Sequence, residues 1–308
     1  MSDLYGAIDC GTNALRLLIA SYDGAVHDVV REMRTVRLGE GVDAHRAFTP
    51  AALERTFAAC DEYARVLHAH PVKALRFVAT SAARDVRNRD DFFGGVQARL
   101  GVRPEVISGA EEASLSYQGA VGGLADVRMP ALVLDIGGGS TEFVLGDAAG
   151  VRASISVPIG CVRMTERSLH SDPPTEAEIA EARTHIRREL DRVAAQVPWG
   201  EAAQVIGVAG SVTTIVAMAL GLPTYDAGAI HGATISRAQV DDVTEALLGM
   251  THGQRAALPF MHPGRVDVIG GGALVLQESL AAIGAPGVTA SEADLLGGIV
   301  CALALTEP

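Results

Sequence analysis

The 308-residue sequence predicts an α/β protein with two duplicated domains that face a central cleft. Apolar, strand-like segments alternate with segments of helical periodicity along the chain, which is typical of the α/β class. The length suits about two domains. The third observation is a repeat: the segment DCGTNALRLLIA at residues 9–20 returns as DIGGGSTEFVLG at residues 135–146.

The repeat has an offset of 126 residues, which aligns Asp9 with Asp135 and Gly11 with Gly137. Each copy is an apolar strand that ends in Asp, followed by a glycine-containing turn and a returning strand. A chance similarity between two common hairpins is the alternative. We interpret the repeat as an internal duplication that gives one hairpin to each half of the chain.

Turn residues bound the apolar runs of the first half and predict strands there. These strands are expected at residues 6–10, 16–21, 26–38, 75–80 and 104–107. Helical spacing predicts a helix at residues 50–68, with Thr49 as its N-cap and Pro50 at its first position. Two further helices are expected at residues 90–100 and 109–119.

The second half repeats this plan. Its strands are expected at residues 131–135, 141–145 and 205–208. Its helices are expected at residues 175–197, 212–220, 237–248, 274–283 and 297–305.

Composition and charge narrow the functional class. The chain is 48% hydrophobic and 20% charged, which excludes an intrinsically disordered protein. Its 25 basic and 37 acidic residues give a formal net charge of −12. That charge argues against a nucleic-acid-binding protein, because such proteins neutralise phosphates with Lys and Arg. A small anionic substrate held by a few local groups remains compatible with it.

The sequence favours a cytoplasmic protein. Its four cysteines lie far apart, without the spacing of a zinc site or a disulfide framework. The N-terminus has no signal-peptide pattern. Residues 202–225 carry no charge and have the length of a membrane span, but glycines, a proline and hydroxyl residues interrupt them and no basic or aromatic flank is present. We therefore expect no membrane segment.

Three glycine-containing turns follow apolar strands, at residues 11–13, 137–141 and 207–214. Glycine lets backbone N–H groups converge on an anion without obstruction by a Cβ atom, and a helix N-terminus also attracts phosphate. Neither a P-loop nor a dinucleotide-binding pattern is present. One such turn is more often a simple hairpin device, but three of them indicate phosphate binding.

Carboxylates accompany these turns. Asp9 and Asp135 end buried strands, where an Asp without a partner is costly, and Glu142 lies near the start of the second returning strand. Such oxygen ligands suit Mg²⁺, and a carboxylate also serves as a general base for water. Glu111 and Glu112 lie in the first turn of the 109–119 helix, where a solvated or capping role is the more common one for Glu111.

Arg84 follows the strand at residues 75–80 and is the best candidate for a bidentate phosphate contact. Arg87 and Arg89 belong to the same basic stretch and are expected on a solvated loop or helix face. The nine histidines show no metal-ligand spacing.

These residues and their order resemble one family, the exopolyphosphatase and guanosine pentaphosphate phosphohydrolase family of the actin/Hsp70/sugar-kinase superfamily. The resemblance covers nearly the whole chain. It rests on AIDCGTN at residues 7–13, ATSAAR at 79–84, VISGAEEA at 106–113, DIGGGSTE at 135–142, GVAGSVTT at 207–214 and RVDVI at 265–269.

The resemblance implies two ribonuclease-H-like (actin-like ATPase) domains around a cleft. They would consist of residues 1–115 with 296–308, as a returning C-terminal helix, and of residues 116–295. It also implies Mg²⁺-dependent release of a terminal phosphate from a linear phosphate chain, with Mn²⁺ as an alternative metal. The implied partner is the substrate, inorganic polyphosphate or guanosine pentaphosphate, and a homodimer is left open.

The same match implies roles for individual residues. Glu112, the second Glu of VISGAEEA, is the expected general base. Asp135 and Glu142 are expected to bind the metal or orient water, and Asp9 is expected as a further metal ligand. The expected phosphate-binding residues are Gly11, Thr12, Asn13, Arg84, Gly137, Gly138, Gly139, Ser140, Gly210 and Ser211.

Two departures from the family pattern bear on function. The family has Ser after Gly-Thr-Asn, whereas this chain has Ala14, which removes one hydroxyl from the expected phosphate site. Long members carry additional C-terminal helical domains, whereas this sequence ends at Pro308, so we expect better turnover of short than of long polyphosphates.

The function favoured by these observations is an exopolyphosphatase in which water deprotonated by Glu112 attacks the terminal phosphoryl group in line. The close alternative is hydrolysis of guanosine pentaphosphate by the same site. An alternative of another class is a non-catalytic protein that binds phosphate chains or nucleotides. A kinase of the same superfamily is less favoured, because nothing in the sequence indicates a second substrate.

Overall fold

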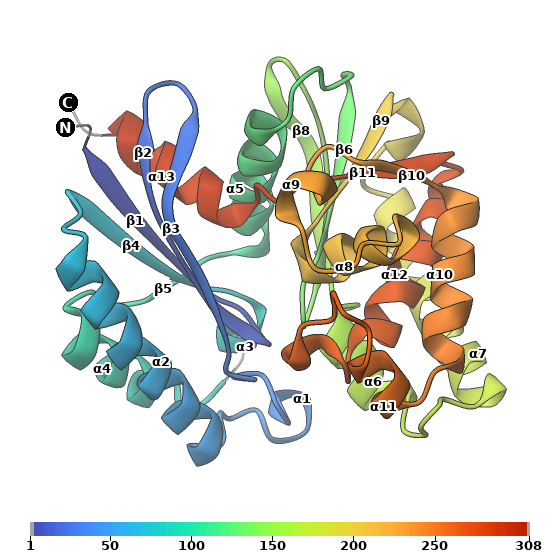
Figure 1. Cartoon of the computed structure of the whole chain (residues 1–308), viewed down its shortest axis with the longest axis horizontal. Coiled ribbons are helices and arrows are strands. Elements are labelled where there is room, and N and C mark those ends of the chain that lie inside the picture. The colour runs from blue at the N-terminus through green and yellow to red at the C-terminus, as the bar shows by residue number, and fades with distance from the viewer. Residues whose placement is uncertain (1–2, 85, 307–308) are drawn as a thin grey trace. The chain divides into compact units, whose positions relative to one another are not determined.

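The computed structural model describes residues 3–84 and 86–306, which divide into two compact units (Figure 1). The first unit contains the residues up to Gly123 and those from Asp294 onward, and the second unit runs from Leu124 to Ala293. The chain therefore leaves the first unit once and returns to it near its C-terminus. Residue 115, where the sequence suggests a boundary, lies within a helix of the first unit.

The first unit is built on a five-stranded sheet. Across the sheet the order is β3-β2-β1-β4-β5; β1, β2 and β3 are antiparallel neighbours, whereas β4 and β5 run parallel to β1. The strands are β1 (Leu4–Cys10), β2 (Ala14–Tyr22), β3 (Val26–Thr35), β4 (Ala74–Ala79) and β5 (Glu105–Val106). The helices are α1 (Val42–His45), α2 (Pro50–Ala69), α3 (Ser81–Arg84), α4 (Arg89–Leu100), α5 (Gly109–Gly123) and α13 (Leu295–Thr306).

Helices cover both faces of this sheet, and side chains of β1 alternate between the two layers. Ile8 and Cys10 pack with residues of α2 and α4 in one core cluster. Tyr5 and Ala7 pack on the opposite face with residues of α5 and α13. Figure 1 shows the two helix pairs on opposite sides of the sheet. Asp9 alternates with Ile8 and Cys10 along β1, so it lies on the face of Tyr5 and Ala7, toward the α5 and α13 layer.

The second unit holds a six-stranded sheet in the order β10-β11-β9-β6-β7-β8. Leu132, Leu134 and Ile136, alternate residues of β6, pack with α7, α8, α10 and α12 in one apolar core. The strands are β6 (Ala131–Ile136), β7 (Thr141–Asp147), β8 (Gly150–Val157), β9 (Gln204–Val208), β10 (Thr234–Ser236) and β11 (Gly287–Ala290). The helices are α6 (Cys161–Ser168), α7 (Glu176–Ala194), α8 (Ala209–Ala219), α9 (Ala227–Ile230), α10 (Arg237–Gly249), α11 (His252–Ala256) and α12 (Ile269–Ile283), with 3-10 turns η1 (Trp199–Glu201) and η2 (Pro263–Arg265).

The two hairpins of the sequence repeat fold alike. The Gly11 amide donates to the Ala14 carbonyl at 3.0 Å, and the Gly137 amide donates to the Ser140 carbonyl at the same distance. In both units the strand before the turn also pairs in parallel with a later strand, β1 with β4 and β6 with β9.

A β-bulge interrupts the next strand pair at equivalent places. It lies between Ile19 and Ala20 where β2 pairs with β3, and between Leu145 and Gly146 where β7 pairs with β8. These positions have the offset of the sequence repeat, so the predicted duplication extends to local irregularities. The predicted α/β class, with two ribonuclease-H-like units of the actin-like ATPase fold, is confirmed.

Some element boundaries differ from the predicted ones. The glycine run before residue 274 reads as a loop, yet it lies inside α12, which begins at Ile269. The helix needs small residues there, because a Cβ atom on Gly272 would lie 2.3 Å from Ser211 Oγ. β3 stops at Thr35 because Arg37 adopts a left-handed conformation. β8, β11 and α6 were not expected, since they are short or carry mixed polar and apolar residues.

The uncharged segment at residues 202–225 forms β9, α8 and the turns beside them. No described helix is both long enough and apolar enough to cross a membrane.

Candidate active site

In the first unit, Asp9 lies one residue before the end of β1 and forms an ion pair with Arg16, its cross-strand neighbour on β2. Arg16 donates to Asp9 Oδ2 through Nε (2.9 Å) and Nη2 (2.5 Å), and its Nη1 donates to Asp294. Oδ1 of Asp9 is buried and has no hydrogen-bond partner among the described residues. Burial raises the pKa of Asp9, although the guanidinium of Arg16 opposes the rise. The motifs do not identify Arg16 or Asp294 in advance.

The turn after β1 is held by the segment that follows β3. The amides of Val36 and Arg37 donate to the Asn13 carbonyl at 3.0 and 2.8 Å, and the Gly39 amide donates to the Thr12 carbonyl at 2.8 Å. The backbones approach closely, since a Cβ atom on Gly39 would lie 2.2 Å from Thr12 Cγ2. Backbone bonds therefore fix the two residues that the sequence assigns to phosphate binding.

Helix α5 brings Glu112 into contact with Arg84. Glu112 lies in the first turn of α5, where its amide donates to the Ser108 carbonyl at 2.9 Å and its side chain is buried. Arg84, at the end of α3, donates from Nη2 to Glu112 Oε2 and from Nε to the Ile107 carbonyl (3.2 Å). The expected base and the expected phosphate-binding arginine are therefore direct neighbours.

Glu111 points in another direction. Successive helix residues lie about 100° apart around the axis. Glu111 Oε1 accepts a hydrogen bond from Arg76 at 2.6 Å, and the same arginine binds Glu105. The side chain of Glu111 is 43% exposed and that of Glu112 is 9% exposed. The helix thus separates a solvated glutamate from an enclosed one.

In the second unit, Asp135 and Glu142 are cross-strand neighbours in the β6–β7 pair, and both are buried. They occupy the positions that Asp9 and Arg16 hold in the first unit. The duplication therefore places two carboxylates where the first unit has an ion pair. Two carboxylates at adjacent positions repel one another and favour a cation between them.

Two serines orient the Glu142 carboxylate. Its Oε1 accepts hydrogen bonds from Ser140 Oγ at 2.8 Å and from Ser156 Oγ at 2.6 Å. The hydroxyl hydrogen of Ser140 is used in this bond, so the backbone amide is the group that Ser140 retains for an anion. Ser156 lies on β8, a strand that the sequence pattern does not predict.

The glycine turn of the second unit is held by the start of α6. The amides of Cys161 and Val162 donate to the carbonyls of Gly137 and Gly138, each at 2.9 Å. Within the described part of the chain, no backbone hydrogen bond uses the amides of Gly138 and Gly139. The turn therefore presents N–H groups that can serve an anion.

A sharp strand-to-helix junction carries the third glycine motif. β9 passes directly into α8 at Ala209, which has a φ of 69°. A left-handed conformation costs a non-glycine residue about 1–2 kcal/mol, and such strain gathers at functional sites. Gly210 and Ser211 follow in the first turn of α8, whose amides lack intrahelical partners and suit phosphate.

Arg265 lies against this junction, a position that its place in the sequence does not predict. A Cβ atom on Gly210 would lie 2.3 Å from Arg265 Nε, so only glycine leaves room for the guanidinium. Arg265 Nη1 donates to Thr214 Oγ1 at 3.0 Å, and its guanidinium lies 5.8 Å from the centre of the Tyr225 ring. The sequence does hold one indication of this role, because Arg265 is the only basic residue of the motif RVDVI at residues 265–269.

Residues 18–307 match the model of the Ppx/GppA phosphatase family. The chain belongs to this family. Exopolyphosphatase 2 of Mycobacterium tuberculosis is 50% identical over 312 residues, which cover 97% of this chain and 98% of the relative. The resemblance seen in the sequence motifs is thereby confirmed.

Solved structures agree with this membership. An exopolyphosphatase-like protein is 44% identical, with a TM-score of 0.93 over 97% of this chain and 98% of that one. A Ppx/GppA family member from Aquifex aeolicus is 27% identical, with a TM-score of 0.82 over 98% of both chains. The Ppx/GppA fold thus extends over nearly the whole sequence.

Two carboxylates of this Ppx/GppA protein suit a magnesium ion, and a third suits it less well. Among the described residues no group of three or more His, Cys, Asp or Glu side chains forms a metal site. Magnesium commonly uses one or two carboxylates together with water and substrate phosphates. Asp135 and Glu142 match that requirement. Asp9 matches it less well, because Arg16 occupies its Oδ2 and leaves only the buried Oδ1.

Proposed function

We propose that the chain hydrolyses the terminal phosphoanhydride bond of linear inorganic polyphosphate and releases orthophosphate. The observation that carries the proposal is the buried Glu112 carboxylate in contact with Arg84. A buried carboxylate beside a phosphate-binding guanidinium is what a hydrolase needs for activating water next to a phosphoryl group.

Glu112 acts as the general base in this proposal. When Arg84 binds the terminal phosphate, its bond to Glu112 is relaxed and the carboxylate is available to water. The water oxygen then forms a bond to phosphorus while its proton passes to Glu112. The bridging oxygen leaves with the electron pair as the end of the shortened chain.

Donors in the second unit suit the transferred group. Its transition state carries negative charge on three equatorial oxygens. The amides of Gly138 and Gly139, the first turn of α8 at Gly210 and the guanidinium of Arg265 are preorganised donors of the kind that stabilises such charge.

Asp135 and Glu142 are the residues that we assign to the metal. Magnesium, when bound there, would neutralise phosphate charge during the transfer. The hydroxyls of Ser140 and Ser156 hold the Glu142 carboxylate in place for this role.

Polyphosphate is the proposed substrate because the relative from Mycobacterium tuberculosis, 50% identical along its length, is an exopolyphosphatase. The test is orthophosphate release from polyphosphate, guanosine pentaphosphate and ATP, measured side by side with Mg²⁺. We expect the highest kcat/KM for polyphosphate. A preference for guanosine pentaphosphate would overturn the substrate assignment. If orthophosphate were released from none of the three compounds, the proposed hydrolase activity would be wrong.

A further inference from the structure

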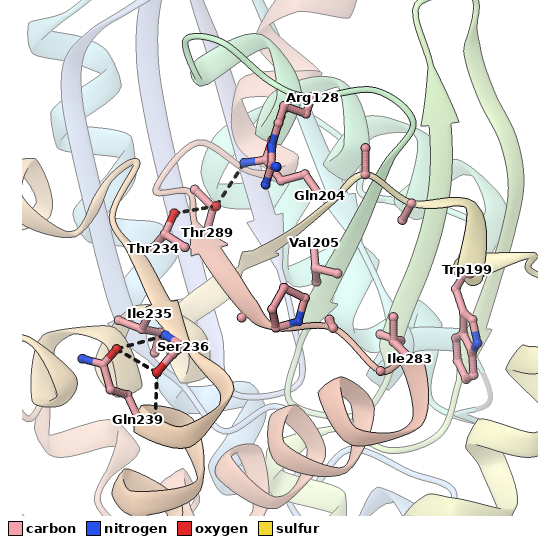
Figure 2. A pocket seen from close by; sticks show the side chains of 17 residues that line it. Arg128, Trp199, Gln204, Val205, Thr234, Ile235, Ser236, Gln239, Ile283 and Thr289 are labelled. Carbon is pink, nitrogen blue, oxygen red and sulfur yellow. Dashed lines mark hydrogen bonds between the residues drawn. The ribbon is translucent and has the colours of Figure 1, made fainter.

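The second unit contains a cavity of about 510 Å³ at the amino ends of β9 and β11 (Figure 2). Pockets for small molecules commonly measure about 300–1,000 Å³. The cavity is remote from the glycine motif at the other end of β9. Gln204 in the cavity wall lies five positions before Ala209 along extended β9, and each position adds about 3.3 Å. The cavity is therefore distinct from the candidate active site.

The cavity carries a positive charge within an acidic protein. Among the described residues that line it, Arg128 is the only charged one, and none is Asp or Glu. The whole chain has a formal net charge of −12. Among the described residues, the Arg128 guanidinium has no ion pair and no hydrogen bond; only its backbone amide is used, in a 2.9 Å bond to Gln204 Oε1. An unpaired guanidinium in a cavity selects an anion.

Neutral polar groups lie beside this charge. Gln204 Nε2 donates to Thr289 Oγ1 at 3.0 Å, and the hydroxyls of Thr289 and Thr234 are 2.8 Å apart, as the dashed lines in Figure 2 show. In either direction of the second bond, Thr234 keeps one further donor or acceptor position. The wall can therefore bind a hydroxyl group of a ligand.

An aromatic ring completes the lining. Trp199 lies on another side of the cavity from Arg128 in Figure 2 and is half-buried. Its indole packs against Phe143, with ring centroids 6.1 Å apart, so its orientation is fixed. A fixed, partly open indole offers a flat apolar face to a planar ring.

We propose that this cavity binds a small anion that carries a planar ring and hydroxyl groups, the chemistry of a nucleoside monophosphate. The phosphate would bind Arg128, the sugar hydroxyls would meet Thr234 and Gln204, and the base would lie against Trp199. This assignment does not depend on the proposed polyphosphatase activity.

Trp199 makes the proposal directly measurable, because it is the only tryptophan of the chain. The full-length protein is titrated with AMP while tryptophan emission is recorded, and calorimetry gives an independent Kd. Adenosine, ribose 5-phosphate and inorganic phosphate are titrated in parallel. We expect a saturable emission change with AMP and weaker binding of each fragment, since each lacks one of the three contacts.

Variants locate the binding. Arg128 is exposed and its side chain has no partner in the part of the chain that the structure describes, so Arg128→Gln should fold normally, which a melting curve checks. We expect about a tenfold or greater rise in Kd for Arg128→Gln and partial recovery in Arg128→Lys. Arg188→Gln, on the exposed face of α7, is the matched control and should leave Kd unchanged. Arg265→Gln should also leave it unchanged.

Three results would overturn the proposal. One is the absence of any saturable signal with AMP. Another is an equal Kd for Arg128→Gln and the unaltered chain. The third is a loss of AMP affinity in Arg265→Gln, because that would place the nucleotide at the α8 junction and outside the cavity.

Discussion

Arg84 donates a hydrogen bond from Nη2 to Oε2 of Glu112, 28 positions further along the chain. The bond joins the end of α3 to the first turn of α5 within the first unit. A buried carboxylate is costly without a partner, so the arginine allows Glu112 to be enclosed. The same hydrogen bond holds the proposed base, Glu112, next to the proposed phosphate ligand, Arg84.

Replacing Arg84 should affect both substrate binding and stability. In Arg84→Gln, a charge-assisted phosphate contact is lost, so we expect KM for polyphosphate to rise about tenfold or more. Glu112 also loses its partner, and the melting temperature should fall. Arg65→Gln on the exposed face of α2 is the control and should change neither quantity. A lower melting temperature with an unchanged KM would reduce Arg84 to a structural role.

Asp135→Asn tests the assignment of the metal. The amide keeps the size of the side chain but removes one of the two negative charges at the Asp135 and Glu142 pair. We expect the Mg²⁺ concentration for half-maximal activity to rise about tenfold or more, and EDTA to abolish activity of the unaltered chain. Asp147→Asn, at the far end of β7, should behave like the unaltered chain. An unchanged Mg²⁺ dependence in Asp135→Asn would remove it from the metal site.

Arg16→Leu should strongly destabilise the first unit. Arg16 binds two carboxylates, Asp9 and Asp294, whose side chains are only 5% and 6% exposed. Removing one member of a buried ion pair costs about 3–5 kcal/mol, because the remaining charge has no partner. Urea denaturation measures the loss, and Lys73→Gln, which removes an exposed pair, should cost no more than about 1 kcal/mol.

The pH dependence of that loss has a definite sign. The folded-state pKa of Asp9 is already raised by burial and should rise further without Arg16. The folded protein then takes up protons before the unfolded chain does, so the deficit should shrink as pH falls toward about 4. A deficit that grows on acidification would contradict this account of the cluster.

His262 should make stability depend on pH near neutrality. Burial, with a further contribution from Arg265, lowers the pKa of His262, and its Nδ1 accepts a 3.1 Å hydrogen bond from the Gly264 amide. As pH falls through about 6.5, His262 binds a proton in the unfolded chain but stays neutral in the folded one. Stability should therefore fall from pH 7 downward and level off below the folded-state pKa.

His262→Asn keeps an acceptor for the Gly264 amide and does not titrate. Its melting temperature should change less between pH 7 and pH 5 than that of the unaltered chain. His68→Asn, on the exposed face of α2, should follow the unaltered chain. Equal slopes for all three proteins would show that His262 does not control this pH range.

Local patterns in the sequence were sufficient for the hairpins and for the split between Glu111 and Glu112. Alternating apolar residues and a repeated Asp define the strands, and the 100° step of a helix separates adjacent glutamates. The alignment also held an unused signal: the offset that pairs Asp9 with Asp135 pairs Arg16 with Glu142. Reading both cross-strand partners would have predicted an ion pair in one unit and a carboxylate pair in the other.

Contacts between residues far apart in the chain could not be predicted from local sequence patterns. Arg16 meets Asp294 278 positions away, and Arg265 meets Thr214 51 positions away. The position of Arg265 depends on how η2 folds back over α8, and no periodicity reports that. The start of α12 was missed for a related reason: Gly272 lies in a helix because it packs against Ser211, and glycine propensity alone favours a loop.

The central claim is that Glu112 is the base, and the kcat of Glu112→Gln tests it most directly. The substitution keeps size and removes the proton acceptor, so kcat for polyphosphate should fall by about 10²–10⁴, or roughly 3–5 kcal/mol of barrier, while the substrate still binds. Glu111→Gln, whose side chain turns to Arg76, is the matched control and should keep kcat within a few-fold of the unaltered chain. A kcat near that of the unaltered chain in Glu112→Gln would contradict the account.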